Sequence, residues 1–260
     1  MLPEVGSWSK RKYHFLSRFL EIFSTGMKNQ WPQRHYIDLF AGSGFARIRG
    51  TQEVVATSAI IAANVKDQFT RLHLCEADSA KSAALENRLS PRGGTFEIHR
   101  GDANTLIYDV LSKIPGRGAL STCFVDPYGL HFTFETASVI ASLPCDLIVL
   151  LPDSMDVTRN WQQYYDQDPN SNLDAFMGEP GWREKFREPG NSDVATRFRE
   201  RYQSRLRTLQ YEHFDSVPVA NDQGVRIYSL MFASRHKLGL KFWTAAKSVD
   251  EGGQREFEFS

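Results

Sequence analysis

The sequence predicts an α/β fold of the doubly wound, Rossmann-like class, built on a mostly parallel sheet. Apolar β-type runs alternate with helix-periodic segments over the first 150 residues, as in parallel sheets. The first run leads into a glycine-rich turn, and the chain closes with two β-type runs around Asn221, Asp222 and Gly224, which predicts a C-terminal antiparallel hairpin. With 260 residues, 41% of them hydrophobic, the chain is long and apolar enough for one well-buried domain.

Five strands and four helices are expected in the alternating part of the chain. The strand candidates are short apolar runs at 36–40, 72–77, 95–99, 122–125 and 146–151. The helix candidates, in which Ala, Leu and Ile recur at helical spacing, are 57–65, 79–89, 104–113 and 134–143. Thr57, Asp78 and Thr133 stand at plausible N-cap positions.

The segments outside this alternation complete the predicted architecture. Residues 1–35 are expected to form an N-terminal helical extension, and 36–260 the main domain. Beyond Pro152 the alternation stops for about forty residues of polar and aromatic sequence. We therefore expect 152–193 to be a cap inserted after the fifth strand. A helix then resumes over 193–210, and the hairpin runs are 212–219 and 225–234.

Composition excludes several functional classes. Lys and Arg number 31 against 31 Asp and Glu, so no global field attracts the protein to polyanions, and any nucleic-acid site must be local. The longest apolar run, 147–151, is too short to span a bilayer, and no signal-peptide stretch opens the chain. We expect a soluble, cytoplasmic protein with no membrane contact, and the sequence gives no prediction of oligomeric state.

Metal and disulfide chemistry are not expected. Cys75, Cys123 and Cys145 are scattered without a C-x-x-C pair and fall in strand-like runs. The seven histidines form no H-E-x-x-H motif and no clustered His/carboxylate spacing. Each histidine is therefore expected to be a core or surface residue, and no catalytic metal is predicted.

The first strand and its turn form a candidate cofactor site. The run Tyr36-Ile37-Asp38-Leu39-Phe40-Ala41-Gly42-Ser43-Gly44 passes from a strand into small residues, where a ligand could lie against the backbone. We expect ligand contacts from Asp38, Phe40, Gly42, Ser43 and Gly44. Arg47 stands where a dinucleotide fingerprint needs glycine, so nicotinamide and flavin binding are disfavoured. Taken alone, the run is better explained as an ordinary strand-to-turn junction.

Acidic residues at the ends of the next two strands strengthen the cofactor prediction. Glu76 could accept both ribose hydroxyls of a nucleoside, and Asp102, followed by Ala103, could accept from an adenine amino group. The alternatives are a solvated strand-end Glu76 and an Asp102 that only caps a helix. Because the carboxyl ends of parallel strands share one edge, these acids together favour S-adenosylmethionine.

The segment Asp126-Pro127-Tyr128-Gly129 indicates the chemistry of a methyl acceptor. An aromatic exocyclic amine is a weak nucleophile because its lone pair is delocalised into the ring. The Asp126 carboxylate and the Pro127 carbonyl could each accept one amino N–H, Tyr128 could stack on the base, and Gly129 would allow close backbone approach. The alternative is a β-turn, for which Asp-Pro-x-Gly is also favourable.

Basic residues beyond the fifth strand are candidate substrate contacts. Arg159 could hold a phosphate and Asn160 a base edge, or both could anchor the inserted cap. Arg197 and Arg201 repeat at i, i+4 spacing with Arg205, which is compatible with a phosphate-binding stripe or with a solvated helix face.

These motifs give the chain a resemblance to a known family. It resembles the three-Cys-motif partner family, TcmP, on the 36–44 run, Gly101-Asp102-Ala103-Asn104, Asp126-Pro127-Tyr128-Gly129, Arg159-Asn160 and the closing Gly239-Leu240-Lys241-Phe242-Trp243. The resemblance implies the fold of class I S-adenosylmethionine methyltransferases, whose last strand is inserted antiparallel. It also implies a partner encoded by an adjacent gene and carrying the three-cysteine motif.

Asp126-Pro127-Tyr128-Gly129 also looks like the Asp-Pro-Phe-Gly of transfer-RNA guanine amino methyltransferases and, less one proline, the Asp-Pro-Pro-Tyr of adenine amino methyltransferases. Cytosine-carbon methyltransferases share the 38–42 opening, but Pro144-Cys145 stands before the fifth strand rather than after the fourth, so that reading is disfavoured. We expect an S-adenosylmethionine-dependent N-methyltransferase acting on an exocyclic amino group of a base, in DNA or RNA, adenine or guanine. The alternatives are a non-catalytic cofactor-binding or scaffold subunit of a partner protein and a small-molecule amine methyltransferase.

Overall fold

The computed structural model describes residues 2–127, 129–168, 171–187 and 193–249, and their centre is a seven-stranded sheet. Its order is β6-β5-β2-β7-β8-β10-β9. The bounds are β2 Gln33–Asp38, β5 Arg71–Glu76, β6 Phe96–Arg100, β7 Ala119–Val125, β8 Cys145–Leu151, β9 His213–Ala220 and β10 Arg226–Ser234. All five expected strands and both hairpin strands are confirmed, with ends displaced by up to three residues.

The sheet is parallel except for one strand. β10 pairs antiparallel with both β8 and β9, with Ser229 opposite Leu151 and Pro218, so it is inserted between two strands that run the other way. β2 pairs parallel with β5 on one side and β7 on the other, and the strand order therefore reverses at β2. In open α/β sheets, ligands bind beyond the carboxyl ends of the strands at such a reversal.

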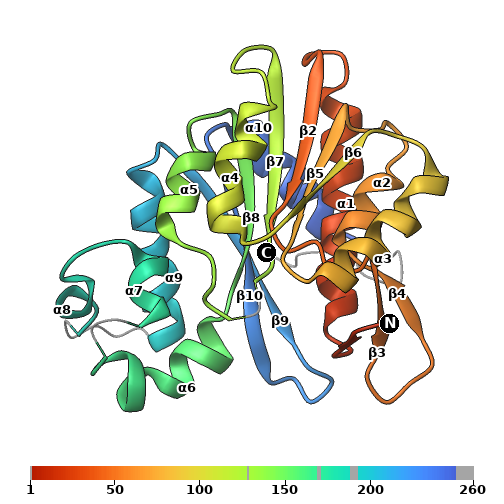
Figure 1. Ribbon diagram of the computed structural model, residues 1–260. Coiled ribbons are helices and arrows are strands. Elements are labelled where there is room, and N and C mark those ends of the chain that lie inside the picture. The colour runs from red at the N-terminus through yellow and green to blue at the C-terminus, as the bar shows by residue number, and fades with distance from the viewer. Residues whose placement is uncertain (1, 128, 169–170, 188–192, 250–260) are drawn as a thin grey trace.

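Helices cover both faces of the sheet (Figure 1). One buried cluster joins the sheet to α1 (Ser9–Met27), α2 (Ser58–Ala63), α3 (Ser79–Leu89) and α10 (Lys237–Lys247). The second joins it to α4 (Ala103–Ser112), α5 (Phe134–Ile140) and α9 (Val194–Arg207). Strand alternation explains the division, since Tyr36 faces the first layer and Ile37 the second.

Side-chain caps fix where several helices begin. Asp78 accepts hydrogen bonds from the backbone N–H groups of Ala80 and Lys81, and Thr133 accepts one from Thr136. Thr57 is the N-cap residue of α2, although its side chain makes no capping bond. The three predicted N-cap positions are therefore correct, and two of the three side chains make capping hydrogen bonds.

The N-terminal segment is helical as expected, but it belongs to the core. Phe19 of α1 packs on Phe232 and Trp243 with ring centroids 5.2 and 5.8 Å apart, and the predicted boundary at residue 36 falls inside β2. The sequence reading also missed α10 and a small sheet of order β1-β3-β4, formed by Glu4–Val5, Phe45–Ile48 and Val54–Ala56. Among the described helices, none combines the length and apolarity that crossing a membrane requires.

The segment between β8 and α9, predicted as an inserted cap, is mostly helical in its described residues, and its role as a cap stays a prediction. It contains α6 (Thr158–Asn160), α7 (Asn172–Met177) and α8 (Trp182–Arg187), with π-helical turns at Asp153–Val157 and Trp161–Tyr165. Aromatic residues pack it against α9, and the ring centroids of Phe176 and Tyr202 lie 4.5 Å apart. Figure 1 shows α6 and the β3–β4 hairpin on opposite sides of the end where the β9–β10 hairpin turns, which is the carboxyl end of the parallel strands.

Candidate active site

Four acidic residues meet at the carboxyl edge of the parallel strands. Asp38 ends β2 and Glu76 ends β5, whereas Asp126 directly follows β7 and Asp102 comes two residues after the end of β6. Asp38 lies opposite Phe124 in the register with β7, and Glu76 lies opposite Arg100 of β6. The predicted convergence of the acids on one edge is therefore confirmed.

The glycine turn after β2 contains one open position and one closed position. Gly42 and Gly44 have φ values of 64° and 89°, a region that favours glycine. A Cβ at Gly42 would meet no atom within 4 Å, whereas one at Gly44 would lie 3.0 Å from Ile60 and Leu85. Room for a ligand therefore exists at Gly42, and the expectation that Gly44 also leaves room is wrong, since Gly44 allows α2 and α3 to pack closely.

Glu76 and Asp102 both bind backbone N–H groups. Glu76 Oε2 accepts from Gly42 at 2.9 Å, and Oε1 accepts from Asp78 at 2.8 Å, which joins the glycine turn to the start of α3. Asp102 is exposed and caps α4, with Oδ1 accepting from Asn104 and Thr105. Asp102 therefore caps the helix, as the alternative interpretation expected, and both capping hydrogen bonds go to Oδ1 rather than to Oδ2.

The other predicted cofactor contacts surround the same turn. Phe40 donates its N–H to Asp38 Oδ1 at 3.2 Å, and the buried Ser43 donates its hydroxyl to the Phe45 carbonyl at 3.1 Å. Ala103 is the buried first residue of α4. Ser43 is thus engaged within the turn, and direct contact of these side chains with a cofactor stays a prediction.

Asp126 is paired with a lysine that the sequence reading left aside. Lys12 Nζ lies 2.5 Å from Asp126 Oδ2, and the two side chains are only 7% and 19% exposed. Burial is the largest single effect and lowers the pKa of Lys12, but the charge of Asp126, the nearby Tyr13 and Tyr228 and the hydrogen bond to Asp126 together hold the pKa above its ordinary value. Lys12 therefore stays charged, and its ammonium also lies 4.6 Å from the Tyr13 ring centroid.

Asp38 is fully buried beside this pair. Burial raises the pKa of Asp38 to about 7, against the effect of hydrogen bonds from Ser58 and the Phe40 N–H, and the charge of Asp126 adds to the rise. Tyr36 also donates its hydroxyl to Asp38 Oδ2 at 3.2 Å. Asp38 thus holds the turn through its hydrogen bond with the Phe40 N–H, and it lies close enough to Asp126 for their charges to interact.

The loop after β7 is tied to the start of α4. Asn104 donates to the His131 carbonyl at 2.8 Å, and its Oδ1 accepts from the Thr133 N–H at 3.1 Å. Pro127 is buried, and Gly129 has a φ of 81°, so the turn needs glycine there. Tyr128, the predicted stacking residue, lies outside the described residues.

The predicted substrate residues lie in or against the cap. Arg159 is exposed on α6, whereas Asn160 donates to Asp156 at 2.8 Å and so helps to hold the cap. Arg197 lies 5.2 Å from the Phe186 ring centroid, and Arg201 pairs with Glu179. The arginine face of α9 packs on the cap rather than standing free in solvent, and substrate contact by these residues stays a prediction.

The sequence did not predict two buried charged side chains at this edge. Besides Lys12, Asp153 is fully buried just after β8, 2.5 Å from Arg199 and 2.7 Å from the Ser229 hydroxyl. A signal for Lys12 existed, since it precedes Leu16, Phe19 and Phe23 at spacings of four, seven and eleven residues on the apolar stripe of α1. A lysine on such a stripe needs a buried anion.

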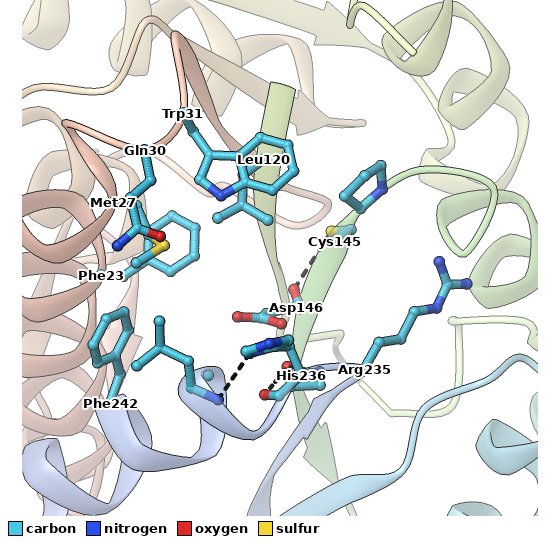
Figure 2. Close-up of a pocket in the computed structure, with 14 residues that line it drawn as sticks. Phe23, Met27, Gln30, Trp31, Leu120, Cys145, Asp146, Arg235, His236 and Phe242 are labelled. Atoms are coloured by element: carbon cyan, nitrogen blue, oxygen red, sulfur yellow. Dashed lines mark hydrogen bonds between the residues drawn. The ribbon is translucent and has the colours of Figure 1, made fainter. Parts of the chain in front are cut away.

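A large cavity lies at the opposite edge of the sheet. Its volume is about 400 Å³, and Figure 2 shows Trp31, Met27 and Phe242 around it with Asp146 at its wall. Burial raises the pKa of Asp146 to about 7, opposed by a hydrogen bond with Ser234. Asp146 begins β8 beside Cys145, so this cavity is at the amino ends of the parallel strands and separate from the acidic edge.

Comparison with known proteins identifies the fold. No family model matches the chain, and no curated protein matches it in sequence. Among solved structures, protein LPL1258 from Legionella pneumophila is similar, with 11% identity, a TM-score of 0.57 and coverage of 94% of this chain and 91% of that one. An O-methyltransferase from Bacillus cereus, solved in complex with SAH, has 10% identity, a TM-score of 0.50 and coverage of 88% and 82%. The chain therefore has the Rossmann-like fold of S-adenosylmethionine-dependent methyltransferases.

Proposed function

We propose that this protein binds S-adenosylmethionine at the acidic edge and transfers its methyl group to an exocyclic amino group of a nucleic-acid base. The observation that carries the proposal is the convergence of four acids, on four adjacent strands, around the open position at Gly42. Glu76 is held rigidly by two backbone N–H groups and is placed to accept from a ribose. The methyltransferase fold supports the same cofactor.

The pair of Asp126 and Lys12 supports an amine acceptor. Bound S-adenosylmethionine would supply a methyl group to the amine nitrogen and leave as S-adenosylhomocysteine, so positive charge would develop on nitrogen until the amine passed a proton to water. The Asp126 carboxylate stabilises that charge and accepts an amino N–H, which draws the nitrogen lone pair out of the ring. Lys12 stays protonated, so it cannot take the proton, and its contact with Oδ2 holds the carboxylate in place.

The nucleic-acid part of the proposal rests on the Asp-Pro-x-Gly turn and on Arg159, which is exposed in the cap beside the acidic edge. Zero net charge means that any polyanion contact is local. Resemblance to the three-Cys-motif partner family implies a partner, an adjacent-gene protein with three cysteines. The proposed enzyme therefore acts on DNA or RNA alone or together with that partner.

The test is transfer of labelled methyl from S-adenosylmethionine to separate DNA, RNA and metabolite pools, with and without the adjacent-gene protein. We expect label in a nucleic-acid pool, in an amino-methylated base after digestion, and its loss in Asp126→Ala with cofactor affinity retained. Glu135→Ala, an exposed carboxylate on α5, is the matched control and should keep full activity. Equal activity in Asp126→Ala would remove the assigned role.

Two other functions would give different results in the same assay. A small-molecule amine methyltransferase, with the aromatic cap closing over a metabolite, would label only the metabolite pool. A cofactor-binding scaffold would bind S-adenosylmethionine but label no pool, even with its partner. Label in protein or in a hydroxyl group would contradict all three.

A further inference from the structure

Three histidines from adjacent strands gather on the α4 side of the sheet, away from the acidic edge. His35 of β2, His73 of β5 and His99 of β6 are buried. The ring centroids of His35 and His73 lie 5.3 Å apart, and those of His73 and His99 lie 5.8 Å apart. Glu97 stands two residues before His99 and so on the same face of β6. The sequence reading expected core histidines but did not foresee the cluster, because its members are distant in the chain.

Hydrogen bonds define which nitrogen of each ring carries the proton. His35 Nε2 lies 3.1 Å from Gln33 Oε1, an acceptor, so His35 carries its proton there and presents a lone pair at Nδ1. That lone pair accepts from His73 Nε2 at 3.1 Å, so His73 has its own lone pair at Nδ1. His99 donates from Nδ1 to Asp109 at 3.0 Å and has its lone pair at Nε2.

The two lone pairs left at the end of this network have no hydrogen-bond partner. His73 Nδ1 and His99 Nε2 are both buried and unpaired. A buried acceptor without a partner costs roughly 1–3 kcal/mol, so such pairs of atoms call for an explanation.

We propose that His73, His99 and Glu97 bind a zinc ion. One ligand atom from each of the three residues lies within 4.8 Å of the other two. Neutral imidazole nitrogens and a carboxylate are ligands that zinc accepts, with a water in the fourth position. Asp109 completes the arrangement, because a carboxylate that receives the other N–H of a ligating histidine orients the ring and raises its basicity.

The charges around Glu97 set the conditions for binding. Lys113 pairs with Glu97, and Arg71 lies 3.3 Å from its Oε2, so the carboxylate is ionised but shared with two cations. Lys113 is 31% exposed and can turn to solvent when a metal arrives. Since Asp38 and Asp126 face the other side of the sheet, the metal would join β5, the edge strand β6 and α4 rather than take part in methyl transfer.

The test is zinc binding to the full chain after removal of metal with a chelator. We expect one equivalent of zinc by calorimetry, a higher midpoint of thermal unfolding with zinc, and a cobalt(II) spectrum of a four-coordinate site. His73→Ala and His99→Ala should each weaken binding by at least about tenfold, and the outer residue variant Asp109→Asn by about tenfold. His131→Ala, which removes an exposed histidine, should bind as the wild type does.

Absence of stoichiometric zinc binding to the folded wild type would overturn the proposal, whatever the variants do. Unchanged affinity in Asp109→Asn and in Glu97→Gln would also overturn it, and both side chains are exposed enough, at 53% and 31%, for these variants to fold. Magnesium and calcium serve as comparison ions, and binding of either as tightly as zinc would contradict the nitrogen ligands.

Discussion

Replacing Lys12 by methionine tests whether the Lys12–Asp126 pair acts as one buried unit. The substitution keeps most of the length of the side chain and its apolar character and removes its charge, leaving Asp126, only 19% exposed, without its partner. Removing one member of a buried ion pair costs about 3–5 kcal/mol. Because Asp126 keeps some contact with water, we expect a loss of about 3 kcal/mol in the free energy of unfolding, measured in urea.

The double substitution gives the decisive comparison. Asp126→Asn alone strands the Lys12 ammonium, which is 7% exposed, and should cost a similar amount. Lys12→Met with Asp126→Asn leaves no buried charge, so the combined loss should fall short of the sum by at least about 1 kcal/mol. Lys10→Met is the control, since the Lys10–Glu53 pair is 39% and 48% exposed and should contribute little. Additive losses would refute the reasoning.

Two further perturbations probe other parts of the structure. In the folded protein Asp146 keeps its proton up to about pH 7, whereas in the unfolded chain it loses this proton near pH 3.8. The free energy of unfolding therefore falls as pH rises from 3.8 to about 7, by up to roughly 4 kcal/mol. Asp146→Asn should therefore exceed the wild type in thermal midpoint at pH 8 and equal it at pH 4, and equal midpoints at pH 8 would contradict the assigned pKa. Arg183→Ala removes bonds to Asp174 and to the Tyr165 carbonyl, so limited proteolysis should cut the 152–193 cap faster while the sheet stays intact. Unchanged cleavage would show that Arg183 does not hold the cap.

The fold was predictable because its signals are local. Each parallel strand is a short apolar run bounded by turn residues, and Asp78, Asp102 and Thr133 cap the helices that follow three of them. The edge at which the acids meet follows from topology alone, since parallel strands end on the same side. That rule placed Asp38, Glu76 and Asp126 together without any knowledge of side-chain contacts.

The interactions that the sequence could not predict join residues distant in the chain. Lys12 meets Asp126 across 114 residues, and His35 meets His73 across 38, so no spacing rule indicates either contact. The small β1-β3-β4 sheet was not predicted because its strands have only two to four residues. Helix α10 was not predicted because residues 239–243 were considered only as a family motif and not for helical spacing. Likewise, the sequence left the arginine stripe of α9 as either a phosphate-binding stripe or a solvated face, and it could not predict that Arg197 and Arg201 contact the cap, because the cap is folded from other segments.

The most direct measurement of the central claim is calorimetric binding of S-adenosylmethionine to the wild type, Gly42→Val and Gly50→Val. Both glycines have positive φ, 64° and 76°, and open space where a Cβ would stand, so the two substitutions impose the same backbone strain. Only Gly42 lies at the acidic edge, whereas Gly50 lies between β3 and β4. The account predicts one bound cofactor per chain for the wild type and Gly50→Val and a loss of binding for Gly42→Val. A folded wild type that binds no S-adenosylmethionine, or equal binding by both variants, would contradict it.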